Sequence, residues 1–184
     1  YIFRRSVDTR HKTVTVVCSV AVVTDKVIPA EKLAALGCAV LDEGDPTDGL
    51  VPGGEISDGR PVIVGFGPCG MFAALILAEM GYRPIVIERG DHVLARAAKV
   101  RHFLSTGELD TETNIQFGAG GAGTFSDGKL VTRINDRRCR YVLERFAQFG
   151  APREILMNAK PHIGTDRLLG VVAGIDSRIC ELGG

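Results

Sequence analysis

The feature that most constrains this chain is the stretch 61–70, PVIVGFGPCG, in which a short apolar run ends at three glycines spaced G-x-G-x-x-G. The run at 61–64 predicts a short strand buried on both faces. The following PCGMFAALILAEM, residues 68–80, predicts a helix that Gly81 closes. RPIVIE at 83–88 predicts a second strand, so the order strand, helix, strand predicts a βαβ unit with parallel strands.

The three glycines have distinct expected tasks between that strand and helix. Gly65 allows a tight turn, Gly67 lets a pyrophosphate approach the backbone, and Gly70 lets the helix pack closely on the strand. Glu88 ends the second strand 23 residues after Gly65, near the ~20 expected for an acid that binds a ribose diol. These agreements favour a nucleotide cradle over a plain glycine turn. Because a carboxylate repels a 2′-phosphate, the cradle is expected to prefer FAD or NAD to NADP.

A second glycine cluster lies in NIQFGAGGAGTFSDGKL, residues 114–130. So many glycines indicate close approach of the backbone to something flat or anionic. Thr124, Ser126 and Asp127 add side-chain hydrogen-bonding groups. The alternative, a mobile surface loop, is disfavoured by the two phenylalanines inside the cluster.

Charge and composition exclude several classes of function. The 184 residues contain 22 basic and 22 acidic side chains, so no net field attracts nucleic acid or an anionic membrane. The apolar run at 14–23 is too short to span a bilayer. The five cysteines are scattered without a C-x-x-C pair, so we expect no metal site and a cytoplasmic location. The oligomeric state is not determined by these features.

Composition also divides the chain. Residues 1–41 predict a small α+β domain, with a strand around 14–23 and a short helix at 29–37. Residues 42–59 are an acidic, glycine- and proline-rich linker without Lys or Arg. Residues 60–184 then form the nucleotide-binding domain. We expect this chain to be the N-terminal part of a longer protein, whose catalytic and substrate-selecting residues lie beyond Gly184.

Three motifs in order carry a resemblance to a known family: RPVIVGFGPCGMFAALILAEMGYRPIVIERG, NIQFGAGGAGTFSDGKL and KPHIGTDRL. With the early RRSVDTR, they resemble the bacterial FAD-dependent NAD(P)/FAD oxidoreductases, often labelled uncharacterised FAD-dependent dehydrogenases. The resemblance extends from about Arg4 to the end of the chain. It implies an α/β fold: a glutathione-reductase-like, Rossmann-like FAD-binding βαβ domain, incomplete here, preceded by a small α+β domain.

The resemblance also implies roles for particular residues. The FAD pyrophosphate is expected at the first glycine loop, the adenosine ribose at Glu88, and the adenine end beside Arg89 and Gly90. The remaining implied cofactor contacts are Gly65, Gly67, Pro68 and Gly70 in the first loop, and Gly120, Gly121, Gly123, Thr124, Ser126, Asp127 and Lys129 in the second. The implied vicinity of the flavin or substrate contains Lys160, His162, Thr165 and Asp166.

The implied activity is that of an enzyme, an FAD-dependent oxidoreductase. Noncovalent FAD accepts a hydride from a reduced nicotinamide, with NAD(P)H as a diffusible donor, or from a small organic molecule of unknown identity. Two alternatives stay open: an NAD-dependent dehydrogenase that uses the same glycine fingerprint, and a flavin- or nucleotide-binding module, RNA-associated or regulatory, without turnover.

Three further patterns have more than one interpretation. His162 is a candidate acid or base, but a structural histidine is favoured because no partner is visible in the sequence. The arginine-rich stretch 133–145 predicts a solvated helix face rather than an RNA-binding patch, because only Tyr141 interrupts it with an aromatic ring. Residues 166–182 predict an amphipathic helix whose apolar face packs on the sheet rather than forming a partner site.

Overall fold

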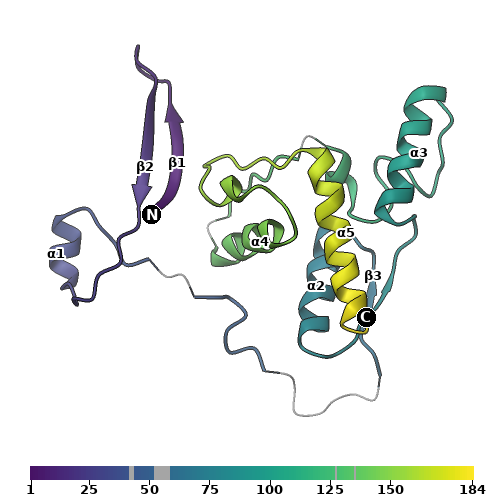
Figure 1. Cartoon of the computed structure of the whole chain (residues 1–184), viewed down its shortest axis with the longest axis horizontal. Helices are drawn as coiled ribbons and strands as arrows, with labels where there is room; N and C mark the ends of the chain where they lie inside the picture. The colour runs from purple at the N-terminus through teal and green to yellow at the C-terminus, as the bar shows by residue number, and fades with distance from the viewer. Residues whose placement is uncertain (42–43, 52–58, 127, 135) are drawn as a thin grey trace.

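The structure, a computed structural model, describes residues 1–41, 44–51, 59–126, 128–134 and 136–184. These residues form a mixed α/β protein with two short sheets (Figure 1). Half of the predicted linker, residues 42, 43 and 52–58, and Asp127 of the second glycine cluster lie outside the described residues. The division of the chain into domains therefore stays a prediction.

The N-terminal part is a β-hairpin followed by a short helix. Strands β1 (Ile2–Asp8) and β2 (Thr15–Val20) pair antiparallel, and α1 (Ala30–Ala35) follows. Every residue of β2 is exposed and α1 buries none of its residues. The hairpin is instead fixed through Arg5 of β1, whose amide donates to Met157 O at 2.7 Å and whose carbonyl accepts from Ala159 N at 2.9 Å.

The predicted βαβ unit is confirmed. Strand β3 (Val62–Val64) leads through α2 (Pro68–Glu79) to β4 (Ile85–Ile87), and the two strands pair in parallel, with Val62 opposite Ile85. Pro68 begins the helix, where its missing amide is not needed and its fixed φ is favourable.

The prediction that these strands are buried on both faces is wrong. Val62, Val64 and Ile87 are 59%, 82% and 53% exposed, whereas Ile63 and Val86 pack against the core. The alternation arises because α2 packs against one face, where Ile63 and Val86 reach the core, and no described residue forms a layer on the other. A continuous apolar run does not by itself show how many faces are covered.

The remaining helices follow β4. They are α3 (Val93–Thr106), the 3₁₀ turn η1 (Ala122–Phe125), α4 (Arg137–Gln148), the 3₁₀ turn η2 (Arg153–Leu156) and α5 (Thr165–Glu181). The predicted amphipathic helix is α5, and its apolar residues Leu168, Val172, Ile175 and Ile179, which recur at helical spacing, are all buried. Helix α5 runs beside α2 (Figure 1).

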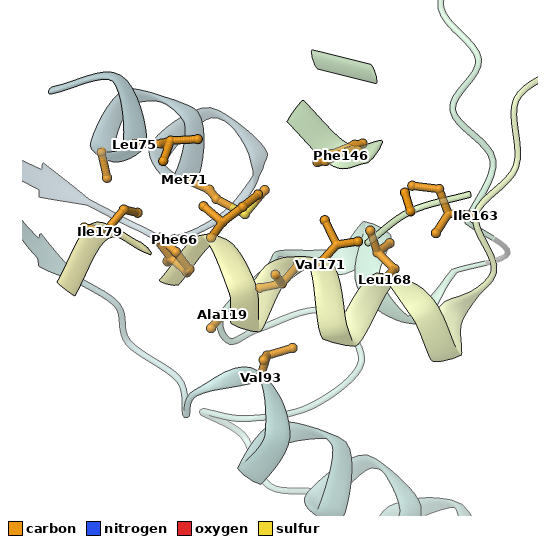
Figure 2. Close-up of a cluster of buried hydrophobic side chains, with 14 of the residues drawn as sticks. Phe66, Met71, Leu75, Val93, Ala119, Phe146, Ile163, Leu168, Val171 and Ile179 are labelled. Atoms are coloured by element: carbon orange, nitrogen blue, oxygen red, sulfur yellow. The ribbon is translucent and has the colours of Figure 1, made fainter. Parts of the chain in front are cut away.

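The core lies between α2 and α5. Leu75 and Ala74 of α2 and Ile175 of α5 are 0% exposed. Figure 2 shows Met71 and Leu75 from α2 meeting Val171 and Ile179 from α5, with Phe66 of the first glycine loop beside them. Because Phe66 and Ala119 belong to this cluster, the core directly supports both glycine loops.

The arginine-rich stretch is only partly the solvated face that the sequence predicts. Arg140 pairs with Glu144 on α4 at 2.7 Å, one turn apart. Arg145 departs from the prediction: its side chain is 16% exposed, forms an ion pair with Glu79 of α2, and lies over the Tyr141 ring. The pattern of charges along α4 cannot show that Arg145 faces another helix.

Within the described ranges, no helix combines the length and apolarity that crossing a bilayer requires.

Replacing Leu75 by alanine should destabilise the protein by about 2 to 5 kcal/mol, because it leaves a cavity between α2 and α5 that the helices cannot fully close. Urea unfolding measures the loss. Leu94→Ala is the matched control, since Leu94 is 67% exposed and its truncation should change the stability by less than about 0.5 kcal/mol. Equal losses for the two variants would contradict the described core.

Candidate functional site

The first glycine loop has the geometry expected of each glycine. Gly65 has a φ of 92° and donates its amide to Ile87 O at 2.7 Å. A Cβ on Gly70 would collide with the Gly65 carbonyl, so the start of α2 lies directly against the turn. A Cβ on Gly67 would meet no heavy atom within 4 Å. The backbone at Gly67 therefore faces open space that a ligand can approach.

Glu88 joins the ends of the two strands. Its Oε2 accepts a hydrogen bond from the Phe66 amide at 2.7 Å, and its Oε1 accepts one from the Gly90 amide at 3.0 Å. The carboxylate is half-buried beside the first glycine loop. The two bonds hold the side chain in place. Each carboxylate oxygen can still accept a further hydrogen bond.

The second glycine cluster lies against the first. The Gly120 amide donates to Phe66 O at 2.7 Å. A Cβ on Gly121 would lie 3.0 Å from Pro68 Cδ and 3.3 Å from Gly67 Cα. Since Phe66 follows β3, the two clusters meet at the carboxyl ends of the parallel strands, where ligands bind in open α/β sheets.

Arg96 of α3 organises the second cluster. Its side chain is completely buried and donates to five backbone carbonyls, at 2.8 to 3.1 Å. The acceptors are the carbonyls of Asn114, Ile115, Gly118, Ala119 and Gly121. Burial lowers the pKa of Arg96, and the nearby Glu88 carboxylate opposes that shift. The guanidinium is thus held by carbonyl dipoles rather than by a direct ion pair.

The loop has no room to adopt another shape around Arg96. A Cβ on Gly118 would lie 2.6 Å from Arg96 Cδ, and the guanidinium lies 4.7 Å from the centre of the Phe125 ring. Gly118, Gly120 and Gly121 all have positive φ, which other residues rarely adopt. These glycines therefore let the chain curl tightly enough to direct five carbonyls at one side chain.

Arg96 was not predicted from the sequence as part of the site. A pattern could have identified it, because Val93, Arg96, Ala97 and Val100 recur at i, i+3, i+4 and i+7 and all four are buried. An arginine on the apolar face of a helix needs internal acceptors. The neighbouring glycine-rich segment supplies them.

Backbone amides gather where the two clusters meet. In the described part of the chain, the amides of Cys69 and Gly70 at the start of α2, and of Ala122 and Gly123 at the start of η1, donate to no protein group. Unpaired amides at helix starts bind anions without a basic side chain. Their number and the open space at Gly67 fit a pyrophosphate.

The Thr124 hydroxyl adds a polar group inside the second cluster. Thr124 is 1% exposed, and its Oγ1 has no hydrogen-bond partner among the described residues. It lies so close to Gly120 that a Cβ there would collide with it. Ser126 is exposed, and its Oγ donates to Gly123 O at 3.1 Å. The Ser126 side chain is therefore accessible to a ligand from solvent, whereas the Thr124 hydroxyl is enclosed within the cluster.

The structure brings the second cluster together with the KPHIGTD motif. Lys129 and His162 are directly opposite each other in an antiparallel bridge, with Leu130 N donating to Pro161 O at 2.9 Å. Opposite residues in such a pair project to the same side. A Cβ on Gly128 would lie 2.7 Å from Gly164 N, so these two segments are in close contact.

The other predicted residues near this bridge lie in the same motif. Thr165 and Asp166 form the first turn of α5, and Lys160 precedes the bridge. All three side chains are exposed. The structure thus collects these residues around one strand pair, and their role toward a flavin or substrate stays a prediction.

Arg89 is fixed beside the ribose candidate. Its guanidinium lies 4.0 Å from the centre of the Phe117 ring, and its Nε lies 3.2 Å from Glu112 Oε2. Phe117 belongs to the second glycine cluster and is 43% exposed. A flat cationic surface therefore borders the end of β4, where the sequence predicts the adenine end of the cofactor.

A three-residue charge cluster ties the segment after β4 to the loop after α3. Lys99 Nζ lies 2.7 Å from an oxygen of Asp91 and 2.7 Å from one of Asp110. Hydrogen bonds from Lys99 and from the Thr113 and Glu112 amides lower the pKa of Asp110 to about 2. The cluster supports the loop that leads to the carbonyls around Arg96.

A comparison with known proteins finds similarity to a protein whose name states no activity. No protein-family model matches the chain. The chain is similar to an uncharacterized protein of Clostridium beijerinckii, with 44% identity over 195 residues, covering 100% of this chain and 34% of that protein. The chain spans about a third of that relative's length. A function therefore has to be argued from the site.

Replacing Arg96 by methionine should destabilise the protein by more than about 2 kcal/mol, because the buried carbonyls lose their donor. Arg96→Lys keeps the positive charge but has fewer donors, so its free energy of unfolding should lie between those of Arg96→Met and the wild type. Urea unfolding gives the energies, and hydrogen exchange should show faster exchange of the Gly120 amide. Arg101→Met, on an exposed position of the same helix, should change neither quantity. Unchanged exchange at Gly120 in Arg96→Met would contradict the role of Arg96.

The depressed pKa of Asp110 predicts a pH dependence of stability. Its folded-state pKa, about 2, lies below the ordinary 3.8, so its contribution is complete above 3.8 and is lost as the pH falls toward 2. The stability difference between the wild type and Asp110→Asn should shrink over that range in urea titrations. Asp25→Asn, at an exposed aspartate, is the control. A difference that does not depend on pH would show that Asp110 acts through something other than its charge.

Proposed function

We propose that this protein is an FAD-dependent oxidoreductase and that residues 60–184 are part of a Rossmann-like FAD-binding domain. The observation that carries the proposal is the contact between the two glycine clusters, where Gly121 lies against Gly67 and Pro68. A plain NAD-binding domain needs only the first cluster. The resemblance of the three sequence motifs to bacterial FAD-dependent dehydrogenases supports the same function.

In this proposal the backbone binds the pyrophosphate. The amides at the starts of α2 and η1 supply the donors, and the partial positive charge at the start of the long helix α2 stabilises the anion. Glycine is needed at Gly67 because a side chain would occupy the space that the phosphates enter. Pro68 has no backbone N–H, but its fixed φ favours the start of α2, so the amides that follow it are presented to the ligand.

Glu88 is proposed to bind the ribose. Its two oxygens are held in position by the amides of Phe66 and Gly90, and their remaining lone pairs can accept the ribose hydroxyls. The same negative charge disfavours a 2′-phosphate in that position. Arg89, stacked on Phe117, provides a flat neighbour for an adenine.

The strand pair with Lys129 and His162 is proposed to flank the flavin half of the cofactor. When bound, FAD supplies the capacity to accept a hydride from a reduced nicotinamide or an organic donor. Lys129 brings a positive charge to this side, and His162 brings an imidazole that can donate or accept a hydrogen bond. We also propose that the whole protein takes electrons from a reduced nicotinamide or an organic donor, passes them to an acceptor, and is located in the cytoplasm.

The visible absorbance of the purified protein with added FAD tests the proposal. Wild-type protein should retain FAD after gel filtration, whereas Gly67→Val should retain at least about tenfold less, because the valine fills the space at Gly67. Gly170→Val is the matched control: Gly170 is a glycine of α5 whose Cβ would also meet no atom within 4 Å. It should retain FAD like the wild type.

The same experiment separates the alternatives. Retention of NAD but not FAD, lost in Gly67→Val, would replace the proposal with an NAD-dependent dehydrogenase. RNA that copurifies and is removed by salt would favour the RNA-associated module. Equal FAD retention by Gly67→Val and wild type would show that FAD does not bind in this cradle.

A further inference from the structure

A cavity of about 480 Å³ lies apart from the glycine clusters, between the N-terminal hairpin and α4. Its walls come from β1, α4, η2 and the segments 44–46, 130–134 and 157–161. The volume falls within the ~300–1,000 Å³ of ligand pockets. Leu130 and Pro161 line it, and both belong to the strand pair that carries Lys129 and His162. The cavity and the proposed flavin side therefore share one structural element.

The hairpin wall of the cavity is held by specific bonds. Besides the two backbone bonds of Arg5 with residues 157 and 159, Arg5 Nη2 donates to Asn158 Oδ1 at 3.0 Å. This docking places the neighbouring Phe3 and Arg4 in the cavity wall. Without the hairpin, the cavity would be an open groove beside α4.

Part of the lining is apolar and suits the body of an organic molecule. Leu130, Leu143, Ile155 and Leu156 line the cavity together with the rings of Phe3 and Tyr141. Ile155 is 1% exposed and Tyr141 is 7% exposed, so these side chains belong to the packed body of the protein. An apolar or aromatic group placed here would be removed from water.

The charged side chains that line the cavity differ in whether they form ion pairs. Both carboxylates already have arginine partners: Arg138 donates to the two oxygens of Asp136 at 2.8 and 2.7 Å, and Arg140 donates to Glu144 at 2.7 Å. Arg4 and Arg137 form no ion pair with any carboxylate in the described ranges. Two guanidinium groups at one partly apolar cavity are complementary to an anionic group.

We propose that this cavity binds a small organic anion, with its carboxylate or phosphate on Arg4 and Arg137 and its apolar body against Leu130, Leu143 and Ile155. If the protein is the FAD-dependent oxidoreductase proposed above, on which this assignment rests, the anion is the organic substrate that reacts with the flavin. The N-terminal hairpin is then one wall of the substrate site, and the strand pair Gly128–Leu130 and Pro161–Ile163 separates substrate from cofactor.

Ligand-observed ¹⁹F NMR tests this with three probes of one shape: 4-fluorobenzoate, 4-fluorophenyl phosphate and the neutral 4-fluorobenzyl alcohol. At least one anion should bind at least about tenfold more tightly than the alcohol, because its charge-assisted bonds are lost in the alcohol. Tighter binding of the benzoate identifies a carboxylate substrate, and tighter binding of the phosphate identifies a phosphate ester. Equal binding of all three probes would overturn the proposal.

Variants locate the probe. Arg4→Gln with Arg137→Gln should weaken binding of the preferred anion at least about tenfold, and because both arginines are exposed, thermal unfolding should be nearly unchanged. Arg101→Gln removes the same charge from α3 and should bind like the wild type. If the double variant binds the anion as well as Arg101→Gln does, the anion binds elsewhere and the proposal fails.

FAD retention, measured on the same samples, separates the two proposals. Arginine-dependent anion binding without FAD retention would leave the anion site standing and remove its assignment as the flavin's substrate site. FAD retention with arginine-independent anion binding would leave the proposed function standing and overturn the cavity as the anion site.

Discussion

The buried guanidinium of Arg96 is the interaction on which the candidate site depends. A buried charge is costly unless it is fully hydrogen-bonded, and here five backbone carbonyls supply the acceptors. The same bonds determine the path of residues 114–121, because each carbonyl must point at one side chain. Residues 114–121 of the second glycine cluster are therefore held in one defined path.

That path has consequences for the first glycine cluster. With Arg96 at the centre, the Gly120 amide reaches Phe66 and Gly121 lies against Gly67. Both Phe66 and Ala119 pack into the core between α2 and α5. The two clusters are thus supported by the same buried side chains, and the unpaired amides of α2 and η1 are brought together without a basic side chain between them.

Local patterns predicted several elements, although not β1 or α3, and they did not predict which residues other elements would cover. The βαβ unit and the buried face of α5 depend on the order of apolar residues and glycines along the chain, and both are confirmed. The exposure of Val64 and the burial of Arg145 depend on which other elements pack nearby. The contribution of Arg96 was missed because its acceptors lie 18 to 25 residues away.

The sequence by itself determined the βαβ unit, with its strands, its helix and the turn glycine Gly65, and the amphipathic helix α5, because periodicity and permitted φ angles are local properties. The meeting of Gly121 with Gly67, the pairing of Lys129 with His162, and the cavity beneath the hairpin were decided only by the tertiary structure. These are contacts between segments distant in the chain, and their geometry depends on packing and buried hydrogen bonds that no short stretch contains.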